Sequence, residues 1–181
     1  MIERTLVVIK PDGVRRGLEK EIISRYEKVG LKIVARKTLR IDKIFAEKHY
    51  AATEEQIVGM GNKTLNASKE NNKIDEMKKI FRTEDPRKIG KMLRDFMINF
   101  ITSGTVVAIV LEGEDAVQKV RDVTGFTDPP RAEKGTIRGD FGEDSIVKAN
   151  FEKRAVANLV HASGSREEAK REIKLWFGEL K

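Results

Sequence analysis

Residues 106–111 read Val-Val-Ala-Ile-Val-Leu and have the most apolar strand pattern in the chain. A short run of β-branched and aliphatic residues without a charge is typical of a strand buried on both faces. Residues 5–9, Thr-Leu-Val-Val-Ile, share this character and lead into Lys10-Pro11-Asp12-Gly13, which has turn chemistry. The sequence therefore predicts two buried strands at these positions.

The segments around these two strands predict the rest of the fold. Further strands are expected at residues 31–41, where apolar and charged residues alternate, and at residues 155–162. Apolar residues at helical spacing predict helices at residues 19–29, 42–50, 89–102, 115–123 and 166–177. Few strands with helices between them favour an α+β protein, a ferredoxin-like βαββαβ domain whose antiparallel four-stranded sheet is covered by helices. We expect one such domain over residues 1–181, with a long loop at residues 125–142.

Residues 53–88 differ in character and are expected to be an insertion within that domain. The segment is polar and turn-rich at residues 61–63 and 68–73. A short helix is expected at residues 75–81, and its apolar stripe would consist of Ile74, Met77, Ile80 and Phe81. The insertion is expected to fold as a helical flap hinged at Gly59 and Gly61, and a mobile surface loop is the alternative.

Composition limits the classes of function. The chain has 181 residues, 39% of them hydrophobic, which is enough to build a core. The net charge of +7 fits either plain solubility or an anionic partner such as a nucleotide, a nucleic acid or a membrane surface. The chain contains no cysteine, which excludes disulfides and zinc–thiolate sites. No stretch is apolar over membrane-spanning length and no signal peptide precedes the first strand, so a cytoplasmic protein is expected.

Two stretches resemble functional motifs without matching them, and one histidine, His49, is not expected to be functional. Residues 59–64, Gly-Met-Gly-Asn-Lys-Thr, fail the spacing of a phosphate-binding loop. Residues 138–142, Arg-Gly-Asp-Phe-Gly, have an aspartate where an RNA-recognition signature needs an aromatic ring. His49 is expected on the exposed face of its helix.

His161 is a stronger candidate, within residues 158–165, Asn-Leu-Val-His-Ala-Ser-Gly-Ser. An apolar strand that ends in His-Ala-Ser places an imidazole close to a hydroxyl at the start of a helix, where anions bind well. Glu172 on that helix could accept a hydrogen bond from one ring nitrogen and leave the other as a nucleophile. From spacing alone, a buried structural histidine is an equally good interpretation.

The segments before His161 are rich in groups that bind anions. Arg138 lies among small residues in Gly-Thr-Ile-Arg-Gly-Asp-Phe, residues 135–141, and Arg121 and Thr127 come shortly before it. Guanidinium groups match the geometry of phosphate oxygens. Phosphoryl transfer depends mainly on positioning and positive charge, so this combination favours that chemistry.

Five blocks of the sequence resemble the nucleoside diphosphate kinase family, and they occur in the family's order. They are residues 3–17 with Lys-Pro-Asp-Gly-Val, residues 103–113, residues 135–141, residues 158–163 with Asn-x-x-His-x-Ser, and residues 172–177. The resemblance implies a ping-pong kinase that moves the γ-phosphate of a nucleoside triphosphate to a nucleoside diphosphate through a phosphohistidine at His161. A non-catalytic nucleotide- or nucleic-acid-binding relative is the alternative.

The resemblance also implies roles for individual residues. Ser163 and Glu172 would orient His161, and Lys10 and Tyr50 would contact the transferring phosphate. The nucleotide would be held by Lys10, Arg121, Thr127, Arg138 and Asn158. Magnesium (Mg2+) would be carried on the phosphates of ATP, ADP, GTP, GDP or other nucleotides and not in a protein cage, and the chain would form a homo-oligomer.

Two positions depart from the family pattern. Gly164 follows His-Ala-Ser where the family has aspartate, which predicts the loss of a local anion and of a helix-capping oxygen. Val58 occupies the position at which the family has a base-stacking phenylalanine. Because Val58 lies within residues 53–88, the insertion is expected near the base end of the nucleotide.

Overall fold

The computed structural model describes residues 1–70 and 72–180, and the chain divides into two compact units. Unit 1 consists of residues 1–41, 103–145 and 157–180, and unit 2 of residues 42–102 and 146–156, within the described residues. Among the described residues, no helix combines the length and the apolar character needed to cross a membrane.

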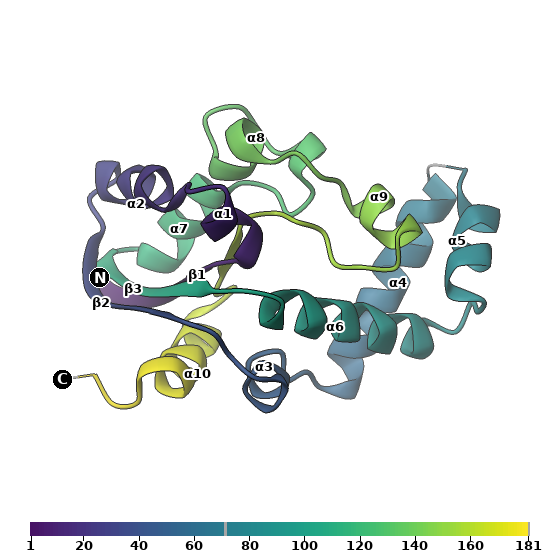
Figure 1. Cartoon of the computed structure of the whole chain (residues 1–181), viewed down its shortest axis with the longest axis horizontal. Coiled ribbons are helices and arrows are strands. Elements are labelled where there is room, and N and C mark those ends of the chain that lie inside the picture. Colours follow the sequence, from purple (N-terminus) through teal and green to yellow (C-terminus); the bar gives the residue numbers. More distant parts are fainter. Residues whose placement is uncertain (71, 181) are drawn as a thin grey trace. The chain divides into compact units, whose positions relative to one another are not determined.

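Unit 1 is built on the four-stranded antiparallel sheet that the sequence predicts (Figure 1). Its strands are β1 (Ile2–Ile9), β2 (Lys32–Leu39), β3 (Val106–Glu114) and β4 (Val160–Ala162). The spatial order β2-β3-β1-β4, with every neighbouring pair antiparallel, is the ferredoxin-like arrangement. The predicted fold class is therefore confirmed.

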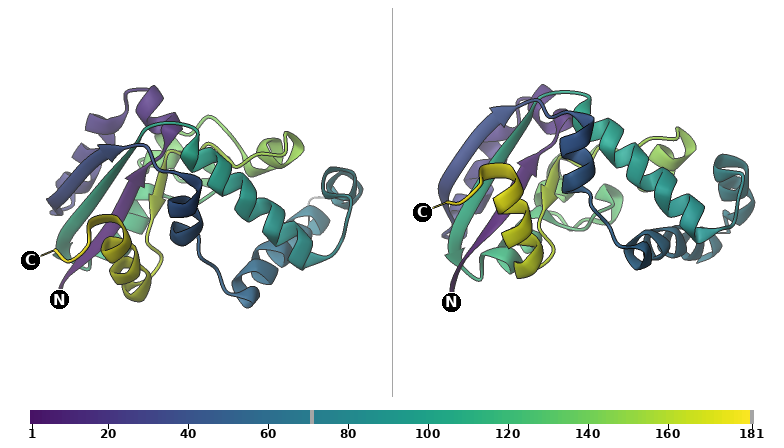
Figure 2. Two further views of the ribbon diagram at one scale, coloured as in Figure 1. Left: turned by 60° about the horizontal axis from the view of Figure 1, so that its bottom comes forward. Right: turned by 90° about the horizontal axis from the view of Figure 1, so that it is seen from below.

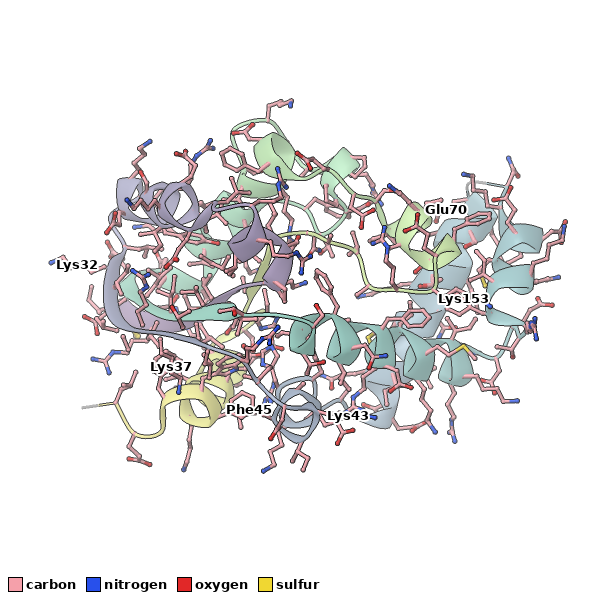
Figure 3. All side chains as sticks on the ribbon, in the orientation of Figure 1. Lys32, Lys37, Lys43, Phe45, Glu70 and Lys153 are labelled. Carbon is pink, nitrogen blue, oxygen red and sulfur yellow. The ribbon has the colours of Figure 1, made fainter. Side chains whose placement is uncertain are left out.

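Both faces of the two central strands, β1 and β3, are buried along most of their length, which explains why these strands are apolar without alternation. Residues Leu6 to Ile9 are fully buried, and successive side chains point to opposite faces. One face packs against α2 (Glu19–Lys28) and α7 (Ala116–Thr124), and α10 (Arg166–Phe177) packs against β1 (Figure 2). On β2, the Nζ of Lys37 lies 4.7 Å from the ring centroid of Phe177 (Figure 3).

Three short helices occupy segments of unit 1 that the sequence predicts as turn or loop. Residues 10–13 open α1 (Pro11–Arg15), because proline at the first helical position is pre-set for a helix. The expected loop at 125–142 contains the 3-10 helix η1 (Pro129–Arg131) and α8 (Ile137–Phe141). The Thr136 hydroxyl accepts from Gly139 N and caps α8, which a glycine-rich pattern conceals. β4 is also shorter than the strand expected at 155–162.

The regular secondary structure of unit 2 is all helical among its described residues. Its helices are α3 (Lys43–His49), α4 (Glu54–Glu70), α5 (Ile74–Phe81), α6 (Pro86–Thr102) and α9 (Ile146–Phe151). The Asp42 carboxylate caps α3 by accepting from Phe45 N at 2.7 Å, as its position in the sequence suggests. The predicted apolar stripe of α5 is confirmed, since Met77 and Phe81 are buried beside Leu65 and Ile89.

The expected hinge at Gly59 and Gly61 is wrong, because α4 runs unbroken through both residues. Gly61 instead allows close packing of α4 on α6: a Cβ at Gly61 would lie 1.9 Å from Pro86 O, and one at Gly90 would lie 1.9 Å from Ile57 O. The helix also confirms that residues 59–64 are not a phosphate-binding loop.

Candidate active site

His161 lies on β4, paired with Val8 of the buried strand β1, and its side chain is 16% exposed. Its Nε2 lies 3.0 Å from both carboxylate oxygens of Glu172, which is 1% exposed on α10. The expected hydrogen bond between these residues is therefore present. Because a carboxylate accepts from an N–H, the proton belongs on Nε2 and the lone pair on Nδ1.

Ser163 fixes the other side of this carboxylate. Its Oγ is buried and donates to Glu172 Oε2 at 2.7 Å, and Arg171 Nη2 lies 3.5 Å from Glu172 Oε1. Both oxygens of Glu172 thus have partners besides the imidazole, which restricts the rotation of the carboxylate and of the ring bound to it.

The electrostatic surroundings favour a neutral imidazole. Burial lowers the pKa of His161, the positive charge of Lys10 lowers it further, and Glu168 acts in the opposite direction. A neutral ring whose Nε2 donates to a carboxylate has an unprotonated lone pair on Nδ1, which is the requirement for a nitrogen nucleophile.

Lys10 joins the end of β1 to the segment before His161. Its backbone N donates to Leu159 O at 2.8 Å, and its buried Nζ donates to Asn158 Oδ1 at 2.7 Å. Burial and the neighbouring Arg138 lower the pKa of Lys10 to about 8, against the opposing effect of Asp12. Asn158 in turn donates from Nδ2 to Thr127 O at 2.8 Å, so its amide is oriented at both ends.

Arg138 is a buried guanidinium whose donors are largely used within unit 1. Its Nε donates to Asn158 O at 3.1 Å, its Nη1 to Gly125 O at 3.0 Å and its Nη2 to Val160 O at 2.6 Å. Burial lowers its pKa to about 10. Of the five N–H donors of an arginine, these bonds leave two. Arg138 therefore holds the backbone of the segment that leads to His161 through hydrogen bonds, and it also supplies positive charge.

The remaining predicted residues are less enclosed. Arg121 on α7 and Thr127 are exposed. Arg121 Nη1 lies 3.4 Å from the position that a Cβ on Gly164 would take, and its charge acts on Arg138. Tyr50 belongs to unit 2, where it follows α3 and its carbonyl accepts from Arg94 Nε at 2.7 Å. His49, expected at the surface, is buried.

The loss of a capping oxygen expected from Gly164 is wrong. Ser165 caps α10 by accepting from Glu168 N at 3.1 Å, and Glu168 Oε2 accepts from Gly164 N at 2.5 Å. Residues 165–168 have the pattern Ser-x-x-Glu, which is the sequence signature of a capping box. This pattern predicts a capped helix start here, although the comparison with the family aspartate alone does not. A carboxylate is therefore present at this helix start, supplied from one turn along α10.

An oriented, neutral imidazole can act as a nucleophile toward phosphorus, and the buried cations beside it can bind phosphate oxygens. This combination on a ferredoxin-like sheet fits a phosphotransferase. A family model described as nucleoside diphosphate kinase matches residues 3–58 and 86–181. The chain belongs to the nucleoside diphosphate kinase family, and it is accordingly a kinase in the class of transferases.

Individual relatives agree over almost the full chain. A nucleoside diphosphate kinase of Pyrobaculum aerophilum is 47% identical over 178 residues, covering 98% of this chain and 96% of the relative. One from Dehalococcoides mccartyi is 39% identical, covering 98% and 94%. The crystal structure of the Pyrobaculum aerophilum NDP kinase has a TM-score of 0.92 at 45% identity, covering 98% of this chain and 96% of that one.

A further solved structure shows a relative with ligands. It is a transition-state mimic of the nucleoside-diphosphate kinase from Borrelia burgdorferi with bound vanadate and ADP, with a TM-score of 0.75 at 35% identity. It covers 97% of this chain and 87% of that one.

Proposed function

We propose that this chain transfers the γ-phosphoryl group of a nucleoside triphosphate to a nucleoside diphosphate in two steps through His161. In the first step the Nδ1 lone pair attacks the γ-phosphorus, the bond to the β,γ-bridging oxygen breaks, and the diphosphate leaves. In the second step a β-phosphate oxygen of another diphosphate attacks the same phosphorus, and the N–P bond breaks. The observation that carries the proposal is the His161–Glu172–Ser163 array beside Lys10.

The surrounding residues would bind and orient the nucleotide. Lys10 and Tyr50 would contact the transferring phosphate, and Asn158, already bonded to Lys10, would contact the sugar. The other phosphates would be held by Arg121, Thr127 and Arg138. The exposure of Arg121 and the two N–H donors that Arg138 retains support these roles.

Mg2+ is proposed to enter with the nucleotide. The carboxylates of unit 1 that act on His161 are poor ligands, because Glu172 bonds His161 and Ser163 and Glu168 accepts from Gly164 N. A magnesium ion held mainly by phosphates and water fits such surroundings. When bound, it would neutralise charge on the phosphates.

We propose that residues 53–88 are an insertion of the single kinase domain that acts at the base end of the nucleotide. The family model leaves residues 59–85 unmatched, and α4 and α5 occupy most of this segment. The packing of α4 on α6 gives the insertion a fixed place within unit 2.

We also propose a homo-oligomer in the cytoplasm. Within the described residues β2 pairs only with β3, so its other edge is open, and Val34 on it is 40% exposed. An open edge strand with an exposed apolar residue is a common pairing surface. Analytical ultracentrifugation of wild type and Val34→Lys would test the assembly.

The test of the central proposal is phosphate transfer itself. Incubation with γ-labelled ATP should give a protein-bound phosphate that is stable to base and labile to acid, and ADP should remove it. Initial-rate plots against both substrates should be parallel, as in a ping-pong mechanism. His161→Ala should keep the fold and lose the label. Intersecting plots with no isolable phosphoenzyme would contradict the proposal, and nucleotide binding without transfer would indicate a non-catalytic relative.

A further inference from the structure

The chain makes an unusually tight turn directly before His161. Val160 N donates to Asn158 O at 2.8 Å, so the hydrogen bond closes a three-residue turn around Leu159. The φ angle of Leu159 is +70°, in the region that favours glycine. A γ-turn with a positive φ at its central residue is rare and strained, particularly around a side chain as large as leucine.

Three residues of unit 1 make four hydrogen bonds to the backbone of this turn. Asp12 Oδ2 accepts from Leu159 N at 2.9 Å, and Lys10 N donates to Leu159 O at 2.8 Å. Arg138 donates to the carbonyls of Asn158 and Val160 on either side. The Leu159 side chain is fully buried in the core. A strained backbone persists only where its surroundings determine it, and these contacts provide that determination.

Asp12 is unusual among these residues, because it is a buried carboxylate with a hydrogen bond to only one of its two oxygens within the part of the chain that the structure describes. It lies on α1 and is 6% exposed, and its Oδ1 has no hydrogen-bond partner among the described residues. A buried carboxylate with one bonded oxygen is costly unless nearby charges compensate it. Lys10 and Arg138 provide that compensation, because the charge of Asp12 acts on both. Side-chain capping of α1 does not account for this arrangement, since the N-cap of α1 has no side-chain bond.

We propose that Asp12 is a positioning residue that holds the strained turn at Leu159 and thereby sets the position of His161 for phosphoryl transfer. The proposal rests on the proposed role of His161. Without the carboxylate, the Leu159 N–H is buried and unbonded, and the turn can relax toward an ordinary strand. That relaxation would displace Asn158 and, two residues on, the imidazole.

Asp12 has a second effect through Lys10. The charged groups that act on Lys10 are Asp12 from α1 and Arg138 from α8, and the neutral imidazole of His161 on β4 is the further titratable group that interacts with it. Burial and Arg138 lower the pKa of Lys10, whereas the negative charge of Asp12 raises it. Neutralising Asp12 should therefore lower the pKa of Lys10 below about 8. The pKa of Lys10 is therefore a readout of the Asp12 charge that is separate from the stability of the fold.

The experiment compares wild type, Asp12→Asn and Asp12→Ala by rapid-quench measurement of His161 phosphorylation by MgATP. Asp12→Ala should lower the phosphorylation rate about 100-fold with a smaller change in nucleotide affinity, as expected for a misplaced nucleophile. Asp12→Asn keeps an oxygen acceptor and should remain within about tenfold of wild type at neutral pH. Its rate should decline at a lower pH than that of wild type. Glu114→Ala, at an exposed ion pair on β3, is the control and should behave as wild type.

A second pair of variants tests the turn directly. In the Asp12→Ala background, Leu159→Gly and Leu159→Ala both remove the buried side chain, but only glycine adopts a positive φ without cost. Phosphorylation should be faster in the glycine double variant than in the alanine one. Equal rates in those two, or a wild-type rate and pH profile in the Asp12 variants, would overturn the inference. An unphosphorylated wild type would instead overturn the proposed function.

Discussion

Both carboxylate oxygens of Glu172 lie 3.0 Å from Nε2 of His161, and the Ser163 hydroxyl donates to one of them at 2.7 Å. The imidazole is therefore oriented by a carboxylate that is itself held in place. The arrangement fixes the tautomer and leaves the lone pair on Nδ1.

Replacing Glu172 by glutamine should lower the rate of His161 phosphorylation by about 100- to 10,000-fold, because the amide holds the tautomer less firmly than a carboxylate and does not stabilise the charge that develops on the ring. Single-turnover kinetics with γ-labelled ATP would measure the loss. Glu179→Gln, at an exposed residue beyond α10, is the matched control. A phosphorylation rate equal to that of wild type would remove Glu172 from the mechanism.

Substitutions at Arg121 and Arg138 should both lower the transfer activity, but only the substitution at Arg138 should also lower the stability of the fold. Arg121→Gln should lower kcat/KM by about 10- to 1,000-fold and leave the melting temperature unchanged, because its guanidinium is exposed. Arg138→Gln should show a similar kinetic loss and also melt earlier, since bonds from a charged donor to three carbonyls are lost. Unchanged kinetics in both variants would place neither residue at the phosphates.

Lys10 should make activity and stability respond to pH in opposite directions. Its folded pKa of about 8 lies below the ordinary value of 10.5, so transfer should decline as pH rises through 8 and the ammonium is lost. Between these two pKa values the unfolded chain binds more protons than the folded one, so this group's contribution to stability rises with pH. Denaturant unfolding of wild type and Lys10→Met from pH 7 to 10 would measure it. A stability difference between them that is constant with pH would contradict the burial of a charged Lys10.

The crossing of α4 and α6 predicts opposite effects for two glycines of one helix. Gly61→Ala should destabilise unit 2 by about 1–3 kcal/mol, because its Cβ would meet the Pro86 carbonyl. Gly59→Ala should stabilise α4 by about 0.5–1 kcal/mol, because nothing lies within 4 Å of its Cβ and alanine favours a helix. Urea unfolding would measure both free energies. Equal effects would mean that α4 does not pack closely on α6.

Hydrogen exchange would test the proposed role of residues 53–88 at the base end of the nucleotide. Amides of α4 and α5 should exchange more slowly with bound ADP than without it, because a ligand-binding segment is stabilised by its ligand. The amides of α2 on unit 1 provide the reference. Exchange in α4 and α5 that is unchanged by ADP would show that the insertion has no part in nucleotide binding.

The sequence predicts the elements whose physical cause is local. Apolar runs predict β1 and β3, and helical spacing predicts α10 with both of its bounds. The hydrogen bond between His161 and Glu172 is also expected, because the two residues lie on a predicted strand and on the predicted helix that follows it. Features that depend on distant segments are not visible in this way. The glycines of α4 suggest a hinge until Pro86 is known to pack against them, and the positive φ of Leu159 depends on Asp12, 147 residues earlier.

Gly164 and Glu168 are in direct contact, so the effects of substitutions at the two positions should be coupled. A side chain at residue 164 would begin 2.8 Å from Glu168 Oε2, where the carboxylate already accepts from Gly164 N. Introducing aspartate at 164 alone would bring two carboxylates together, and removing Glu168 alone would leave this helix start without its anion. We therefore expect the effects of substitutions at Gly164 and Glu168 to be non-additive, because each position decides whether the other has to supply the negative charge at this helix start.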